Sequence, residues 1–80
     1  MNDIYELAPS MRLLIAMHNV SSVDPATAKS LDELRIASGM SEPELQNAVR
    51  ELLSYGYVEC KGTAYYLSRL GICVIRSVYT

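Results

Sequence analysis

The sequence predicts a small α+β domain that is mostly helical, and three observations support this. Two predicted helices, each capped by a serine (Ser30 and Ser41), follow one another with only the short segment Gly39-Met40 between the first helix and the second cap. Two β-rich runs then flank the turn dipeptide Lys61-Gly62, and dense apolar segments lie on either side of this central region. The 80 residues suffice for one domain, so we expect residues 1–80 to form a single unit.

The first helix is expected over residues 9–19. Pro9 suits the first turn of a helix, where its missing amide does no harm. Apolar residues are dense in this segment, and only Arg12 and His18 are ionisable, which predicts a mostly buried helix with His18 at its exposed C-terminal end. Residues 21–29, which include Asp24-Pro25, are expected to form a loop that holds at most a short turn.

The second helix begins after Ser30, because Ser30 and Glu33 have the spacing of a capping box. Leu31, Leu34 and Ile36 are expected to turn inward. Gly39 ends the helix, since glycine readily adopts the left-handed conformation found after helix C-termini.

The third helix is expected over residues 42–55, after a second capping box made by Ser41 and Glu44. It ends at Gly56. Apolar side chains at spacings of three and four define its inner face: Leu45, Ala48, Val49, Leu52 and Leu53. The opposite face carries Gln46, Asn47, Arg50, Glu51 and Ser54.

A β-hairpin is expected over residues 57–67, with Lys61-Gly62 at its turn. Ser68 then caps a last helix, residues 69–79, which is apolar around most of its circumference and should be covered on more than one side.

In this order, the elements resemble the winged helix-turn-helix family. Residues 30–55 look like its helix-turn-helix and supply two of its three N-terminal helices. Residues 57–67 look like its wing, and residues 69–79 look like its C-terminal dimerisation helix. Residues 52–58 resemble the family's L-x-x-x-G-hydrophobic-V stretch. Residues 65–71 resemble its Y-x-L-T-x-x-G stretch, with Ser68 in place of threonine. Small MarR-like and PadR-like regulators and short archaeal and viral proteins all share this pattern.

The resemblance implies a transcription regulator that binds double-stranded DNA with its recognition helix, residues 42–55, in the major groove. Gln46 and Asn47 would read base edges, and Arg50 would read guanine or hold a phosphate. The implied contacts are Ser41, Gln46, Asn47, Arg50, Lys61, Lys29 and Arg35. Each is also consistent with a solvated surface, and Glu42, Glu44 and Glu51 on or beside the same helix would repel phosphates.

A homodimer is expected for two reasons. Half of the residues are hydrophobic, which is more than so small a domain buries by itself, and two copies present two recognition helices to one site. The expected interface is on the last helix: Ile72, Val74, Ile75, Val78 and Tyr79.

Composition argues against other classes of function. Cys60 and Cys73 do not have the spacing of a metal site, although a disulfide stays open, and no catalytic or cofactor-binding motif is present, so we expect no enzyme, cofactor or small-molecule ligand. No apolar run is long enough for a membrane span, which favours a cytoplasmic protein. The net charge of −2 keeps an alternative open, a winged helix that docks on another protein without binding DNA.

Overall fold

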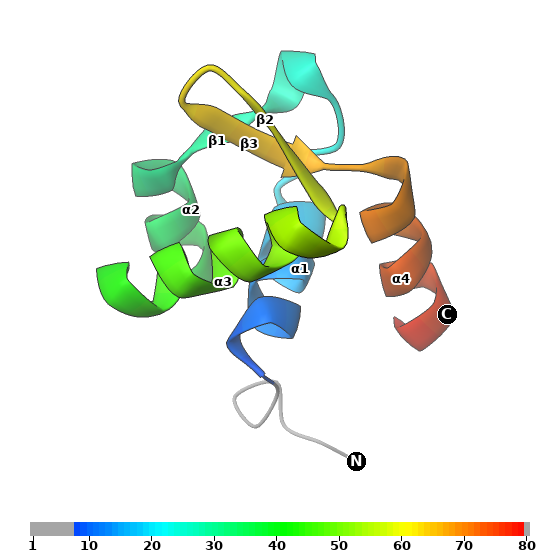
Figure 1. Ribbon diagram of the computed structural model, residues 1–80, viewed down its shortest axis with the longest axis horizontal. Helices are drawn as coiled ribbons and strands as arrows, with labels where there is room; N and C mark the ends of the chain where they lie inside the picture. Colours follow the sequence, from blue (N-terminus) through cyan, green and yellow to red (C-terminus); the bar gives the residue numbers. More distant parts are fainter. Residues whose placement is uncertain (1–7, 80) are drawn as a thin grey trace.

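The computed structural model describes residues 8–79 of the chain, with side chains as far as Ser77. This part is a small, mostly helical α+β fold with four α-helices and one antiparallel sheet of three strands, as the sequence predicts (Figure 1). In chain order the elements are α1 (Pro9–Asn19), the 3₁₀ helix η2 (Pro25–Thr27), β1 (Lys29–Ser30), α2 (Leu31–Ser38), α3 (Glu42–Tyr55), β2 (Val58–Lys61), β3 (Ala64–Leu67) and α4 (Arg69–Tyr79).

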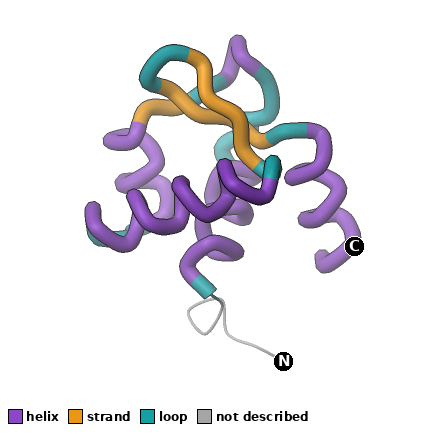
Figure 2. Tube along the Cα trace, in the orientation of Figure 1, coloured by secondary structure: helices purple, strands orange, loops and turns teal. Residues whose placement is uncertain are grey.

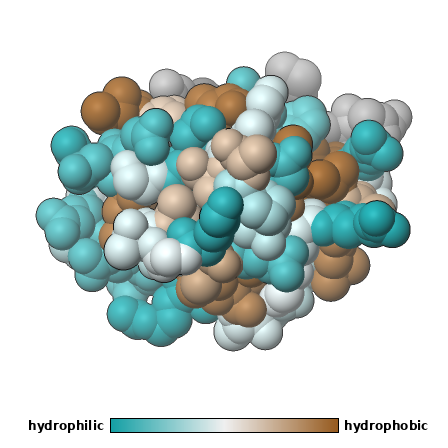
Figure 3. Space-filling view, turned by 90° about the horizontal axis from the view of Figure 1, so that it is seen from above, coloured by the Kyte–Doolittle hydropathy of each residue, from teal (hydrophilic) through white to brown (hydrophobic). Residues whose placement is uncertain are grey.

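The sheet forms one layer, the four α-helices lie beneath it, and the 3₁₀ helix η2 lies at the top of the view (Figure 2). Its strand order is β1-β3-β2, so β3 is central and β2 is an edge. In the view of Figure 1, α3 crosses in front of α1, while α2 and α4 lie at opposite ends. Seen from the sheet side, the surface mixes hydrophilic and hydrophobic residues (Figure 3). Within residues 8–79, none of the helices has the length and apolar character needed to cross a membrane.

The helix ends follow from local hydrogen bonding. The Ser30 hydroxyl accepts from the Glu33 amide, and the Glu33 carboxylate accepts from the Ser30 amide, which completes the predicted capping box of α2. Hydrogen bonding of the Glu33 carboxylate with the Ser30 backbone amide and, second, with the Ser30 side chain lowers the pKa of Glu33. Gly39 and Gly56 end α2 and α3 in the left-handed conformation, as expected.

The second predicted capping box is only half right. The Ser41 hydroxyl caps α3 by accepting from the Glu44 amide at 3.4 Å. The Glu44 carboxylate, however, pairs with the Arg12 guanidinium of α1 at 3.7 Å. A charged partner on the neighbouring helix therefore holds the side chain that was expected to reach back to Ser41.

The core lies between α1, α2, α3 and the sheet, with α4 closing one end (Figure 1). Leu34 is fully buried in it and Leu31 is half-buried, as expected. Ile36 was predicted to face inward, but it is 75% exposed. The reason is that Leu31 and Leu34 already fill the short inner face of α2, and Ile36 lies about 160° around the helix from Leu34.

The loop before α2 holds a short helical turn, as the sequence allowed, and a two-residue strand, which was not predicted. The Asp24 carboxylate accepts from the Thr27 amide at 2.9 Å and caps η2. The two residues of β1 pair with β3, Lys29 opposite Tyr65 and Ser30 opposite Ala64. The loop is thereby fastened to the sheet, and β1 leads directly into α2.

The hairpin turn is shifted by one residue from the predicted Lys61-Gly62. Lys61 pairs with Ala64 and belongs to β2, so the connection consists of Gly62 and Thr63. Gly62 has a φ of 60°, a left-handed value that suits the first central position of a two-residue hairpin turn.

The junction of β3 and α4 depends on close backbone contact. The Ser68 amide donates to the Tyr57 carbonyl, while the Ser68 hydroxyl donates to the Gly56 carbonyl at 2.5 Å and accepts from the Gly71 amide at 3.1 Å. A Cβ on Gly71 would lie 2.1 Å from the Tyr57 carbonyl oxygen. Only glycine allows α4 to lie this close to the residue before β2.

Candidate functional site

The exposed side of α3 is the candidate site, and it divides into a ridge and two flanks. The ridge consists of Asn47 and Arg50, which point away from the core formed by Leu45, Ala48, Val49 and Leu52. The Arg50 guanidinium donates to the Asn47 side-chain oxygen at 3.2 Å. This bond joins two of the predicted contact residues into one polar pair.

One flank of α3 is acidic and faces α1. Glu44 and Glu51 line a groove there together with Pro9, Ser10 and the ridge residue Asn47. The Arg12 guanidinium pairs with Glu44, and the Ser10 hydroxyl donates to Glu51. Two of the three α3 carboxylates are thus drawn to α1 rather than to the ridge.

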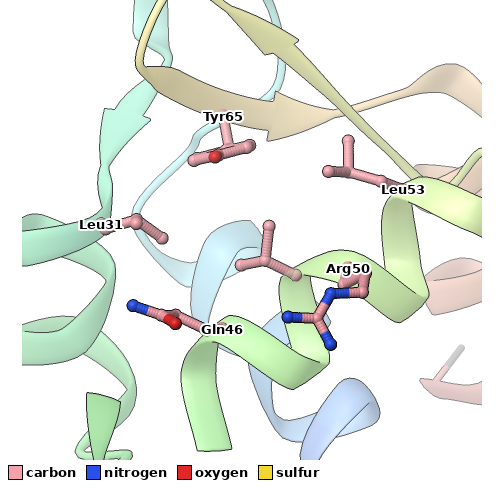
Figure 4. A pocket seen from close by; sticks show the side chains of 6 residues that line it. Leu31, Gln46, Arg50, Leu53 and Tyr65 are labelled. Carbon is pink, nitrogen blue, oxygen red and sulfur yellow. The ribbon is translucent and has the colours of Figure 1, made fainter. Parts of the chain in front are cut away.

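The other flank of α3 borders a hollow beneath the sheet. We name it the Tyr65 hollow, and its lining comes from α2, α3 and β3: Leu31, Gln46, Val49, Arg50, Leu53 and Tyr65 (Figure 4). Gln46 and Arg50 lie along one side of it, on α3, with Leu31 and Tyr65 across from them (Figure 4). The sequence did not single out Leu31, Leu53 and Tyr65 as site residues, because only the packing of three elements brings them together.

The third carboxylate of α3 lies beside Gln46. The Gln46 amide nitrogen donates to the Glu42 carboxylate at 3.2 Å, one turn earlier. Gln46 would have to exchange this local bond for any contact with a ligand.

The remaining predicted contact residues are spread over neighbouring elements. Arg35 on α2 and Lys61 at the end of β2 are exposed. Ser41 is exposed at the N-terminus of α3. Lys29 is half-buried, and its ammonium group donates to the Thr27 carbonyl at 3.0 Å, so it is partly engaged within the chain.

The two faces of the sheet have different surroundings. The groove on the face away from α3 is bordered by Asp24, Glu59, Tyr66 and Arg69. Desolvation, followed by the nearby Glu59 carboxylate, raises the pKa of Tyr66. This groove is separate from the ridge and from the Tyr65 hollow.

Comparison of the sequence with protein-family models and with curated proteins finds no match.

The expected dimer residues on α4 differ in their surroundings. Ile75 is only 5% exposed and belongs to the chain's own core, which leaves little of its side chain for the expected interface. Ile72 and Val74 are half-buried and pack against the same core. The side chains of Val78 and Tyr79 lie outside the described residues. Leu70, which is not among the predicted interface residues, is 51% exposed on this helix.

Both cysteines are free and exposed, Cys60 on β2 and Cys73 on α4. Among residues 8–79, no three or more His, Cys, Asp or Glu side chains gather where they could hold a metal ion.

Proposed function

We propose that this chain is a winged helix-turn-helix transcription regulator that binds double-stranded DNA as a homodimer. The observation that carries the proposal is the polar ridge of Asn47 and Arg50 on α3, from which Glu44 and Glu51 are turned aside. In this assignment α3 enters the major groove, and the ridge faces the base edges.

The connection between α2 and α3 supports this assignment. Three residues, 39–41, join the two helices, and Gly39 adopts a φ of 69°. A turn of this length that contains glycine is typical of the helix-turn-helix motif. Met40 within the turn is buried, which fixes α2 against α3.

The placement of the carboxylates supports DNA binding in spite of the net charge of −2. Phosphates repel exposed carboxylates, and three of them occur on α3. Since Arg12 and Ser10 hold two of these on the α1 side, Arg50 is the charged residue of the ridge. Ser41 and the first amides of α3 add donors for a phosphate, and Lys61 adds a cation from the wing.

The homodimer is proposed on the apolar residues of α4. Ile72 and Val74 are half-buried and Leu70 is half-exposed, so this helix keeps apolar surface after folding. Exposed apolar surface on a small domain is typical of an interface. Two copies would double the few cationic contacts that one copy makes with a pseudo-palindromic site.

The test is fluorescence anisotropy of a labelled random duplex titrated with the protein, first at low salt and then at rising salt. The wild type should bind, and the logarithm of its affinity should fall linearly with the logarithm of the salt concentration. Arg50→Ala should reduce the slope of this plot by about 1 and weaken binding. Asn47→Ala should weaken binding to a selected site and leave the slope unchanged, because the asparagine is neutral.

The matched control is Arg69→Ala, which removes the same charge on the other face of the sheet. It should bind random duplex more tightly than Arg50→Ala does. The proposal fails if the wild type does not bind at low salt, or if Arg69→Ala and Arg50→Ala weaken binding equally.

A second candidate function is docking on another protein, and the exposure of Ile36 favours it. An isoleucine that is 75% exposed on α2 buries little of its side chain within the described part of the chain. A docking module would show no binding in the DNA titration, and its partner contact would be lost in Ile36→Glu. Capture of a partner by the wild type and by Arg50→Ala alike, but not by Ile36→Glu, would support this second function.

A further inference from the structure

The Tyr65 hollow has an apolar floor and a cationic rim. Leu31, Val49 and Leu53 supply the apolar surface, and Leu53 is 38% exposed. Arg50 is the one charged residue among those that line it, and Gln46 and Tyr65 add polar groups (Figure 4). An occupant that matches this lining carries a negative charge beside an apolar part.

The dimensions of DNA indicate what meets this flank when α3 binds. The major groove is about 12 Å wide, and an α-helix with its side chains has a diameter of about 10–12 Å. A helix in the groove therefore presents its outermost ridge to the bases and its two flanks to the two sugar–phosphate strands. The ridge of α3 is Asn47 and Arg50, so the Tyr65 hollow faces one strand.

We propose that the Tyr65 hollow seats one sugar–phosphate unit of the bound DNA strand. The deoxyribose packs on Leu31 and Leu53. Arg50 belongs to the ridge and also lines the hollow, so it holds the adjoining phosphate, and Asn47 is the ridge residue that faces the base edges. This inference rests on the proposed function. It adds which flank of α3 holds the DNA backbone and which apolar residues contact it.

The two flanks of α3 differ in a way that makes the docking one-sided. The α1 flank carries Glu44 and Glu51, whose charges disfavour a phosphate. The Tyr65 hollow offers Arg50 and an uncharged floor instead; the Glu42 carboxylate on this side accepts from Gln46 and is not among the residues that line the hollow. One strand is thus seated closely, while the other passes the acidic flank at a greater distance.

The experiment places the same new charge on either flank of α3. Leu53→Glu puts a carboxylate at the mouth of the Tyr65 hollow. Tyr55→Glu, two residues later, adds the same charge about 200° around the helix, at an exposed residue that is not among those lining the hollow. Binding of a random duplex is measured by anisotropy at low salt, and far-UV circular dichroism with the melting temperature checks that each variant is folded.

Leu53→Glu is expected to bind at least about tenfold more weakly than Tyr55→Glu, because its carboxylate enters the seat of the phosphate. Leu53→Ala should weaken binding about threefold to tenfold without changing the salt slope, since it removes only apolar contact. Equal affinities of Leu53→Glu and Tyr55→Glu would overturn the seat. Absence of binding by the wild type would instead overturn the proposed function, so the two failures are distinguishable.

A second pair of duplexes identifies the apolar group in the hollow. A duplex of alternating dA and dT is compared with one in which uracil replaces thymine, which removes only the methyl group. The seat for deoxyribose predicts equal affinities of the wild type for both. A loss on the uracil duplex that is absent in Leu53→Ala would assign the hollow to the thymine methyl group and overturn the sugar–phosphate seat.

Discussion

At the scale of single residues, the fold depends on a few close contacts with the backbone, made by Gly71 and Ser68. Gly71 allows α4 to lie against the Tyr57 carbonyl, and Ser68 fastens the start of α4 to Gly56. These contacts join the C-terminal helix to the turn between α3 and β2. A change at either residue therefore acts on three elements at once.

Gly71→Ala is expected to destabilise the fold by about 3 kcal/mol or more, because its methyl group would overlap a backbone carbonyl that cannot rotate away. Urea unfolding followed by circular dichroism measures the loss. The control is Gly39→Ala, at a φ of 69° with open space around the new Cβ, which should cost only about 1 kcal/mol. Equal losses would show that the approach to Tyr57 is not what requires glycine at residue 71.

Glu33 is expected to make the stability of the fold depend on pH in the acidic range. Its pKa is lowered in the folded state by the bonds from Ser30, so it stabilises the fold above its unfolded pKa of about 4.3. This contribution is lost as the pH falls through the lower, folded pKa. Glu33→Gln keeps an acceptor for the Ser30 amide but cannot titrate. The melting temperatures of the two proteins should therefore differ at neutral pH and converge on acidification; a constant difference would contradict the assignment.

At the scale of elements, the capping serines are expected to contribute unequally to the stability of the fold. Ser41 is an exposed cap with one amide donor, whereas Ser68 is buried and bonds to both Gly56 and Gly71. A buried hydroxyl with two partners is harder to replace than an exposed one, since its loss leaves both partners unsatisfied.

We therefore expect Ser68→Ala to cost about 2–3 kcal/mol and Ser41→Ala about 1 kcal/mol. Ser68→Thr should recover much of the loss, because a threonine hydroxyl can make the same bonds. Chemical denaturation of the three variants under one set of conditions tests the order. A larger loss for Ser41→Ala than for Ser68→Ala would refute it.

At the scale of the whole molecule, charge is distributed rather than concentrated. The chain carries a net charge of −2, yet two of the three α3 carboxylates, Glu44 and Glu51, lie on the α1 side of the ridge of Asn47 and Arg50, and the third, Glu42, bonds to Gln46 on the other side. The apolar surface is divided in a similar way: Ile75 lies in the core, while Leu70 stays half-exposed on the same helix. Assembly of two copies through α4 would bury the apolar surface that this helix leaves exposed.

Sedimentation velocity should show the wild type as a dimer, and Leu70→Glu should shift it toward the monomer because a carboxylate would be buried at the interface. Ile36→Glu makes a similar exchange on α2 and should leave the assembly unchanged. A wild type that remains monomeric at every loading concentration would remove the homodimer from the proposal.

The sequence by itself determined the order and type of most elements. The capping serines, the glycines after α2 and α3 and the hairpin turn are local signals, and α1, α2, α3 and both hairpin strands lie close to their predicted bounds. The polar residues of α3 were also predicted, because a helical spacing assigns them to the face opposite its apolar residues.

Only the tertiary structure decided how these residues are used. Ile36 was expected inside but is 75% exposed, and Ile75 was expected at an interface but lies in the core, since burial depends on which neighbouring side chains fill the core. Arg12 draws Glu44 toward α1, and α2, α3 and β3 together form the Tyr65 hollow. Local signals fix what a segment becomes, whereas contacts between segments distant in sequence fix which of its side chains remain available for binding.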